Sequence, residues 1–239
     1  MTITIRPGMK LSPGVSVKVP TLPLTTDGLV LHYDFSNPTC YPGTGVAVID
    51  LSTASNSGAV VNDFSNITYV SDNQTSYFNW SSNNGGGNNN PFGSSIHTTS
   101  TNTYKDFTII FQPDFTAGGI VGLFTIGSDK SIRFYNGVNG TGPWALANPG
   151  NGDDWASSPT TYYVNGQATN TTVAGWNIIG GAKNNAGFAE PGQLYIGTSG
   201  VETRNMQGKI AVVLMYNRVL TQQEHLVNYN HFKTRFGLT

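Results

Sequence analysis

The chain has 239 residues and a formal net charge of −1 at pH 7, and only 10% of its residues are charged. A balance this close to neutral leaves no basic patch for nucleic acid and no attraction to an anionic membrane surface. No apolar run approaches the roughly 18 residues that span a bilayer. We therefore expect neither a nucleic-acid partner nor membrane insertion. The single cysteine, Cys40, excludes an intrachain disulfide.

Residues 1–24 predict an extended β-arm. Two stretches of alternating polar and apolar residues, 2–5 and 15–19, are separated by two Pro-Gly corners. The prolines deny backbone donors to a central strand, which suits a sheet edge or the sheet of a partner. The alternative is that residues 15–19 are simply the first strand of the body. We predict an assembly arm that docks on a neighbouring subunit or capsid surface through Ile3, Ile5, Val15, Val17 and Val19.

The body, residues 25–239, predicts a single all-β domain. Short runs of β-branched and aromatic residues, punctuated by Gly or Asn-Gly, indicate strands. The clearest of these runs are Ile120–Gly127, Ser131–Tyr135, Thr160–Val164, Trp176–Gly180 and Gln193–Gly197. The pairs Asn136-Gly137 and Asn165-Gly166 fit hairpin turns of type I′, in which both central residues need positive φ. The pattern predicts an antiparallel two-sheet jelly-roll sandwich.

The aromatic residues divide into core candidates and residues near loops. Residues 79–95 are rich in Gly, Asn and Ser and predict a long exposed loop, which either carries recognition or has no partner. Trp80, at the border of this loop, is predicted to be exposed, whereas Trp176 is predicted to pack inward. Six phenylalanines in strand-like runs are predicted core residues: Phe35, Phe107, Phe111, Phe115, Phe124 and Phe134.

The last thirty residues predict a buried strand followed by a short helix. Ile210, Val212 and Leu214 alternate with residues that are apolar too, as expected of a strand covered on both faces. Thr221 and Glu224 have the spacing of a capping box, in which each side chain bonds the backbone N–H of the other residue. The strand therefore leads directly into a capped C-terminal helix.

This ending, preceded in order by residues 28–46, 48–52 and 107–115, is similar to the laminin-G/concanavalin-A-like lectin and glucanase superfamily, as found in tailed-bacteriophage structural proteins. The resemblance covers nearly the whole chain. It implies the same sandwich fold, with Arg218 in the Tyr-Asn-Arg sequence as part of the architecture. Because this fold hosts lectins, hydrolases, lyases and inert modules, the resemblance implies much less about function.

Catalytic carboxylates are not evident in the sequence. Glycoside hydrolases use two carboxylates that flank the scissile bond, and the glucanases of this superfamily carry them as Glu-x-Asp-x-x-Glu. The three glutamates, Glu190, Glu202 and Glu224, lack this spacing, and the four histidines lack metal-ligand spacing. The strand motifs of the polysaccharide lyases are missing as well. We therefore expect that the chain is not an enzyme.

A loop with tryptophans and acidic residues is the candidate for glycan binding. Sugar sites combine aromatic rings, which stack on pyranoses, with Asp and Asn side chains, and calcium often orders such loops. The alternative is that the tryptophans cover the edge of the core and that the Asp pair is solvated. The predicted glycan-binding residues are Trp144, Asn151, Asp153, Asp154 and Trp155, with Asp153 and Asp154 as candidate Ca²⁺ ligands.

Two functions follow from these patterns. The first is a non-enzymatic structural or decoration protein on the virion surface of a tailed bacteriophage, at the head, neck or tail. Its partners would be other virion proteins and further copies of itself, as a homo-oligomer, and it would adhere weakly to host surface glycans. The lack of a signal peptide predicts synthesis in the host cytoplasm. The alternative is a lectin module whose calcium-assisted carbohydrate site lies near residues 148–155.

Overall fold

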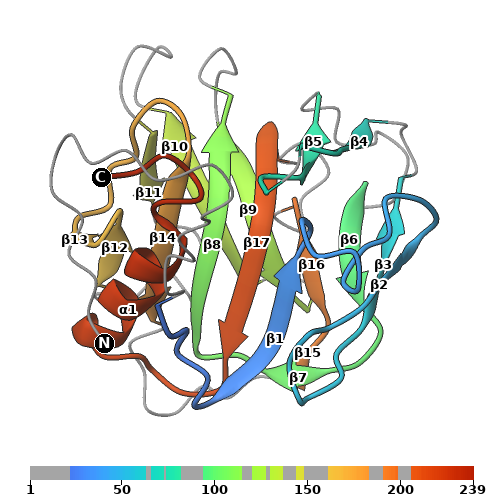
Figure 1. The fold of residues 1–239 in the computed structure, drawn as a ribbon, viewed down its shortest axis with the longest axis horizontal. Coiled ribbons are helices and arrows are strands. Elements are labelled where there is room, and N and C mark those ends of the chain that lie inside the picture. Colours follow the sequence, from blue (N-terminus) through green and yellow to red (C-terminus); the bar gives the residue numbers. More distant parts are fainter. Residues whose placement is uncertain are drawn as a thin grey trace, which may run out of the picture.

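The computed structural model describes residues 22–62, 66–72, 74–81, 94–114, 120–127, 130–136, 144–147, 161–182, 191–198 and 206–239. For residues 120–121, 130–131, 133–136 and 144–147 it describes the backbone only. The strands form an eight-stranded and a seven-stranded sheet, with a further two-stranded sheet beside them (Figure 1). The predicted all-β antiparallel sandwich is confirmed.

The eight-stranded sheet is centred on its longest strand, β17. Its order is β13-β12-β14-β8-β17-β5-β4, and β1 pairs with β17 as well. Residues 208–210 of β17 pair with β5 and residues 212–216 pair with β1, so β17 is covered along its length. The strands are β1 (Leu29–Asp34), β4 (Ile67–Val70), β5 (Tyr77–Trp80), β8 (Asp106–Pro113), β12 (Tyr162–Val164), β13 (Gln167–Ala168), β14 (Asn177–Ala182) and β17 (Gly208–Tyr216).

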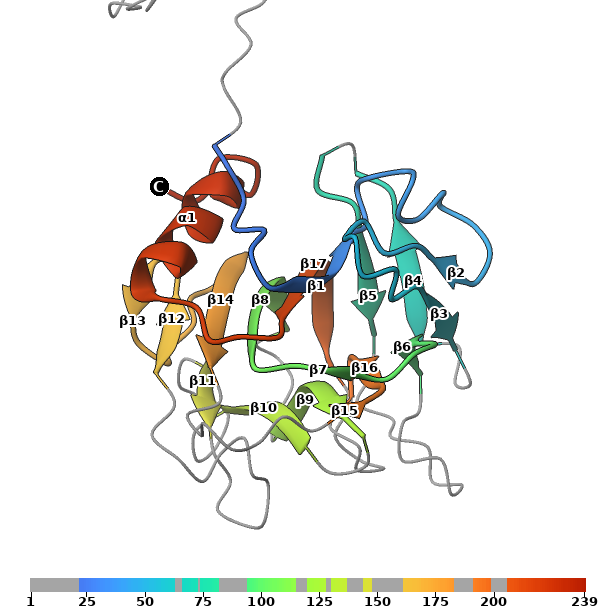
Figure 2. The same cartoon turned by 90° about the horizontal axis from the view of Figure 1, so that it is seen from below.

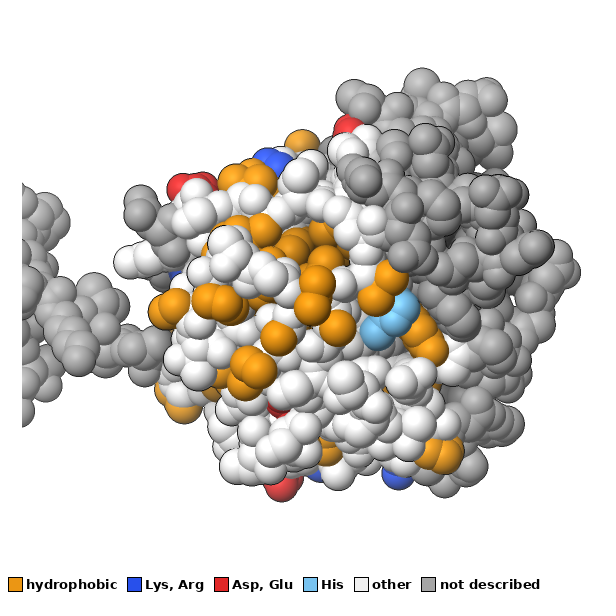
Figure 3. Space-filling view, turned by 90° about the vertical axis from the view of Figure 1, so that its right-hand side faces the viewer, with side chains coloured by type: hydrophobic (Ala, Val, Ile, Leu, Met, Phe, Trp, Pro, Cys, Tyr) orange, Lys and Arg blue, Asp and Glu red, His pale blue; other side chains and the backbone are white. Residues whose placement is uncertain are grey.

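The seven-stranded sheet has the order β11-β10-β9-β16-β6-β3-β2. Its edge near β2 exposes Val46 and Ile49 by 64% and 42%, and this side of the molecule carries many hydrophobic and few charged side chains (Figure 3). Its strands are β2 (Ala47–Val48), β3 (Gly58–Val61), β6 (Ser95–Thr98), β9 (Ile120–Ile126), β10 (Lys130–Asn136), β11 (Trp144–Ala147) and β16 (Leu194–Ile196), and the small sheet consists of β7 (Asn102–Thr103) and β15 (Pro191–Gly192).

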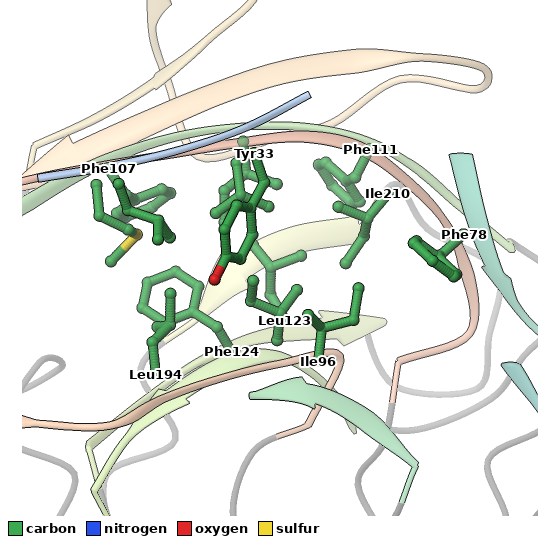
Figure 4. Close-up of a cluster of buried hydrophobic side chains, with 14 of the residues drawn as sticks. Tyr33, Phe78, Ile96, Phe107, Phe111, Leu123, Phe124, Leu194 and Ile210 are labelled. Atoms are coloured by element: carbon green, nitrogen blue, oxygen red, sulfur yellow. The ribbon is translucent and has the colours of Figure 1, made fainter. Parts of the chain in front are cut away.

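The inner cluster of the core lies between the two sheets. Figure 4 shows Phe107 and Phe111 from β8 facing Phe124 and Leu194 from the opposite sheet, and all four side chains are fully buried. Burying an aromatic or branched side chain of this size stabilises the fold by about 1.5–3 kcal/mol. Phe35 belongs to the same cluster, so the core predictions for these phenylalanines are confirmed. Phe115 and the side chain of Phe134 lie outside the described residues.

The outer cluster of the core lies between β17 and the C-terminal helix α1 (Gln222–Phe232). Ile210 and Val213 face the inner cluster, whereas Val212 and Leu214 face the outer one. A register shift between Ile210 and Val212 marks a β-bulge, which places Ala211 on the same side as Val212. The prediction that this strand is covered on both faces is confirmed.

Helix α1 begins at the predicted capping box. The Thr221 hydroxyl accepts from the Glu224 backbone N–H at 3.3 Å, and the Glu224 carboxylate accepts from the Thr221 N–H at 2.8 Å. Arg218 donates to the same carboxylate and forms an ion pair with Asp27 at 2.7 Å. Arg218 therefore has a structural role: it links the start of α1 to the segment before β1, as the resemblance implied. No described helix is long and apolar enough to cross a membrane.

Figure 2 shows α1 against the β12–β14 end of the eight-stranded sheet, away from β4 and β5. The chain before β1 runs along this helix, where the Thr25 N–H donates to Asn228 Oδ1 at 3.1 Å and His231 Nδ1 contacts the Leu22 carbonyl. The five residues predicted to form the assembly arm, from Ile3 to Val19, lie outside the described residues. The arm and the boundary at residue 24 therefore stay predictions.

Two local expectations had different outcomes. Asn165 and Gly166 have φ of 50° and 78° and join β12 to β13, so this predicted hairpin turn is confirmed. Trp80 was expected to be exposed, and this was wrong. Its side chain is 1% exposed, and Nε1 donates to the Ser94 carbonyl at 3.1 Å. Alternation along β5 turns Trp80 into the core and leaves Asn79 on the outer face.

Candidate functional site

The residues predicted for glycan and calcium binding are not assembled into a site by the described structure. Trp144 opens β11 and pairs with Asn136 of β10, and only its backbone is described. Asn151, Asp153, Asp154 and Trp155 lie outside the described residues. Within the part of the chain that the structure describes, no group of three or more His, Cys, Asp and Glu could hold a metal ion. The predicted loop site therefore stays a prediction.

A row of polar side chains crosses four neighbouring strands on the outer face of the eight-stranded sheet. In the strand register, Thr68 lies opposite Asn79, Asn79 opposite Lys209, and Lys209 opposite Gln112. Neighbouring strands are about 4.8 Å apart, so these side chains follow one another at that spacing. We call Thr68, Asn79, Lys209 and Gln112 the polar row. Their neighbours along the strands point into the core.

Gly208 allows β17 to pass close to β8 where the polar row lies. It has a φ of +122°, and a Cβ at this position would lie 2.2 Å from the Gln112 carbonyl oxygen. Only glycine accommodates both the backbone conformation and the contact. The residue before it, Gln207, accepts from the Asp114 backbone N–H at 3.1 Å and continues the pairing. The backbone at this end of the sheet is therefore closely defined.

The polar row opens into a hollow of about 540 Å³, which we call the outer hollow. Three members of the polar row line it: Asn79, Gln112 and Lys209. The other lining residues are Trp80, Ser81, Pro113, Asp114, Ala174, Gly175 and Gly208. A volume of this size lies within the range of about 300–1,000 Å³ that is usual for small-molecule sites. Its lining offers both hydrogen-bond donors and acceptors, as a polyhydroxylated ligand requires.

An aromatic wall lies next to the polar row, although its three residues are not among those that line the outer hollow. Tyr77 lies on the same face of β5 as Asn79. The centroids of the Tyr77 and Trp176 rings are 5.7 Å apart, and the interplanar angle is 66°. Trp176 contacts Phe236 in turn, with ring centroids 5.0 Å apart. The Lys209 Nζ lies 5.0 Å from the centre of the Tyr77 ring and joins the wall to the polar row. Tyr77, Trp176 and Phe236 are the aromatic wall.

The sequence had suggested that Trp176 packs inward. In the structure it lies on the outer face of the sheet and not between the two sheets. It precedes β14, is half-buried, and packs against the outer cluster. Tyr77 is half-buried in the same way. Both rings therefore support the outer cluster and still present part of their surface to solvent. Aromatic rings in this position provide an apolar surface for a sugar ring.

A second hollow, of about 520 Å³, lies near the β1–β2 connection. Tyr41, Thr44, Tyr69 and Ser71 are among its lining residues, and none of the described side chains that line it is charged. The Tyr41 hydroxyl donates to the Gly45 carbonyl at 2.8 Å, and the Tyr69 ring lies 4.9 Å from that of Tyr41. The second hollow is thus a neutral counterpart of the outer hollow.

A buried histidine–aspartate pair was not anticipated from the sequence. His225 Nε2 lies 3.3 Å from Asp106 Oδ2, and the two side chains are 3% and 0% exposed. Asp106 also accepts from the backbone N–H groups of Phe107 and Leu220, at 2.6 and 2.7 Å. Burial raises the pKa of Asp106, although these partners act in the opposite direction.

This pair has the chemistry of a proton-transfer dyad, but its surroundings leave no place for a substrate. The neighbouring cavity measures about 10 Å³, which is about the space of one water molecule. The imidazole stacks on Tyr163 with ring centroids 4.5 Å apart, and a Cβ at position 180 would lie 2.4 Å from its Nδ1. We interpret the pair as a structural link between α1 and β8.

The comparisons with known proteins establish the fold and no family. No protein-family model and no curated protein matches the sequence. The chain is similar in structure to Trypanosoma rangeli sialidase in complex with 2,3-difluorosialic acid, with a TM-score of 0.54 and 15% identity over 89% of this chain and 34% of that one. A second structure of T. rangeli sialidase gives a TM-score of 0.52 and 15% identity, over 90% of this chain and 35% of that one.

Domain 4 of an extracellular arabinanase from Geobacillus stearothermophilus, in complex with arabinotriose, gives a TM-score of 0.48 and 14% identity, over 83% of this chain and 96% of that domain. This score is too low to carry an argument. The chain spans about a third of the length of the sialidases that it matches. At 15% identity the likeness to them shows the fold alone.

One expectation is corrected by these comparisons. The absence of recognisable catalytic carboxylates had led us to expect that the chain is not an enzyme. The structures to which it is similar are sialidases, which are enzymes, so the exclusion is contradicted. The relation to them is a distant one of fold. Neither the laminin-G resemblance nor the bacteriophage context is matched by a finding of these comparisons.

Proposed function

We propose that the chain is a carbohydrate-binding β-sandwich module and that the outer hollow is its glycan site. The observation that supports this proposal is the polar row of Asn79, Lys209 and Gln112 beside the aromatic wall. The row offers amide and ammonium groups to sugar hydroxyls, and Tyr77 and Trp176 offer a ring surface to the apolar face of a pyranose.

The structural neighbours support a carbohydrate-related role. The sialidase structures contain a sialic acid derivative or sialic acid itself in several cases. The fold that this chain shares with part of them therefore occurs in proteins that act on glycans. The loop predicted from sequence, with Trp144 and the Asp153–Asp154 pair, is a second candidate site for the same function and would involve Ca²⁺.

A role as a virion decoration protein is the second proposal. It rests on the ordered sequence resemblance to bacteriophage structural proteins and on the predicted arm of residues 1–24. It is compatible with glycan binding, since a protein displayed on a particle can also adhere to host surface glycans. Co-sedimentation of the full chain with phage particles, compared with residues 25–239, would test it. Equal sedimentation of both would contradict the proposed role of the arm.

The glycan site is tested by screening the full chain on a glycan array and measuring the best ligand by calorimetry. Trp176→Ala removes the central ring of the wall and is expected to weaken binding at least about tenfold. Gln167→Ala, on the exposed edge strand β13 of the same sheet, is the matched surface control. Thr44→Ala changes the second hollow and shows whether the ligand binds there instead of in the outer hollow. Binding that survives Trp176→Ala and fails with Thr44→Ala would contradict the assignment.

A further inference from the structure

The charge of Lys209 distinguishes the outer hollow from the second hollow. Within the described residues, Lys209 Nζ contacts Gln112 Oε1 at 3.3 Å and the Tyr77 ring at 5.0 Å, and no ion pair joins it to a carboxylate. By contrast, Arg235 makes two bonds to Asp34, at 2.7 and 2.8 Å. Among the described residues Lys209 is therefore a cation without an ion-pair partner in this hollow, which Asp114 also lines.

The side-chain amides beside Lys209 carry hydrogen-bond donors. Gln112 Oε1 accepts from Lys209, and among the described residues no group accepts from the two N–H donors of this amide. Asn79 lies on the other side of Lys209, and no hydrogen bond within the described part of the chain engages its side-chain amide. Two amide groups thus flank one ammonium group. A carboxylate, which only accepts hydrogen bonds, matches this arrangement.

We propose that the outer hollow selects sugars that carry a carboxylate, with Lys209 as the residue that recognises it. This inference rests on the proposed function. The aromatic wall would take the apolar face of the pyranose ring, and the polar row would take the carboxylate. Hexuronic acids and sialic acids share this chemistry. Asp114, which lies in the same hollow, opposes an anion, so the carboxylate belongs at the β5–β17 side of the row.

The test compares acidic oligosaccharides with neutral counterparts. The probes are a glucuronic-acid disaccharide with its carboxyl-reduced form, and sialyllactose with lactose, each titrated into the full chain. We expect the acidic member of at least one pair to bind about tenfold more tightly, because hydrogen bonds to charged groups are worth more than neutral ones. This preference should decline as the salt concentration rises.

Variants at position 209 then test whether Lys209 causes the preference for acidic over neutral sugars. Lys209→Gln should reduce the ratio of acidic to neutral affinity to near unity, whereas Lys209→Arg should retain the preference for the acidic sugar. Lys233→Gln is the matched control, because Lys233 also lies over a tyrosine ring, 5.5 Å from Tyr229. It should behave like the wild type.

The outcomes separate this inference from the proposed function. Equal binding of acidic and neutral sugars, lost on Trp176→Ala, would overturn the carboxylate selectivity and leave the glycan site in place. A preference that survives Lys209→Gln would also overturn it. An absence of binding by every probe and on the array would overturn the proposed function, and this inference with it.

Discussion

Lys209 lies directly opposite Asn79 in the antiparallel pairing of β17 with β5, and both side chains emerge on the outer face of the eight-stranded sheet. This face is covered by α1 over β12 and β14 but not over β5 (Figure 2). The pairing places two polar groups from distant parts of the sequence side by side next to the aromatic wall. It is the geometric basis of the proposed glycan site.

Asn79→Ala should weaken glycan binding about two- to tenfold, the range expected for one lost hydrogen bond. The stability of the fold should change little, because the side chain is only half-buried and no described residue bonds its amide. Calorimetry with the best array ligand measures the first effect and thermal unfolding the second. A large loss of stability with unchanged affinity would contradict this role for Asn79.

Gly208→Ala should destabilise the fold more than Gly45→Ala. Both glycines have positive φ, at +122° and +83°, but a Cβ at 208 meets the Gln112 carbonyl oxygen at 2.2 Å, whereas one at 45 has no atom within 4 Å. We expect about 1–2 kcal/mol for Gly45→Ala from its backbone conformation alone, and a larger loss for Gly208→Ala. Urea unfolding of the two variants measures the difference, and equal losses would contradict the close approach of β17 to β8.

Thr221→Ala should lower the free energy of unfolding by about 1 kcal/mol, since it removes the helix cap. Thr221→Ser keeps the hydroxyl that accepts from the Glu224 N–H and should retain most of this stability. The comparison by urea unfolding is informative because the two changes differ by one oxygen atom. If Ser and Ala destabilise equally, the capping bond is not what stabilises α1.

The hydrogen bonds from Arg218 and from the Thr221 N–H lower the pKa of Glu224 from 4.5 to about 2. A carboxyl whose pKa is depressed in the folded state stabilises the fold above its unfolded pKa, and this contribution is lost as the pH falls through the folded pKa. The wild type should therefore be more stable than Glu224→Gln at neutral pH. The difference should shrink as the pH falls from about 4.5 towards 2, as measured by thermal unfolding across that range. A difference that stays constant with pH would contradict the ion pair.

The strands and the helix cap could be predicted because their signals are local. The apolar residues on both faces of β17 indicate a strand between two layers, and Thr221 with Glu224 indicates the start of α1. The exposure of Trp80 was mispredicted because the composition of the following loop outweighed the alternation along β5. Alternation places Phe78 and Trp80 in the core, and this signal was present in the sequence.

The outer hollow could not be predicted because it depends on strand register. Thr68, Asn79, Gln112 and Lys209 come from four separate segments, and a slip of one residue in any strand would turn its side chain into the core. The His225–Asp106 pair depends in the same way on how α1 packs against the sheet. The sequence instead directed attention to Trp144 and Trp155, where aromatic and acidic residues are adjacent in the chain.

The most direct test of the glycan site is a two-dimensional NMR titration of the full chain that follows its four tryptophan indole N–H signals. The ligand is the best binder from the glycan array, and each signal is assigned by a Trp→Phe variant. We predict that the Trp176 signal shifts with saturation. Trp80 also lines the outer hollow, but its indole is buried and its Nε1 is bonded to Ser94, so its signal should shift less than that of Trp176. Shifts confined to Trp144 and Trp155, with Trp176 unmoved, would contradict the outer hollow as the site.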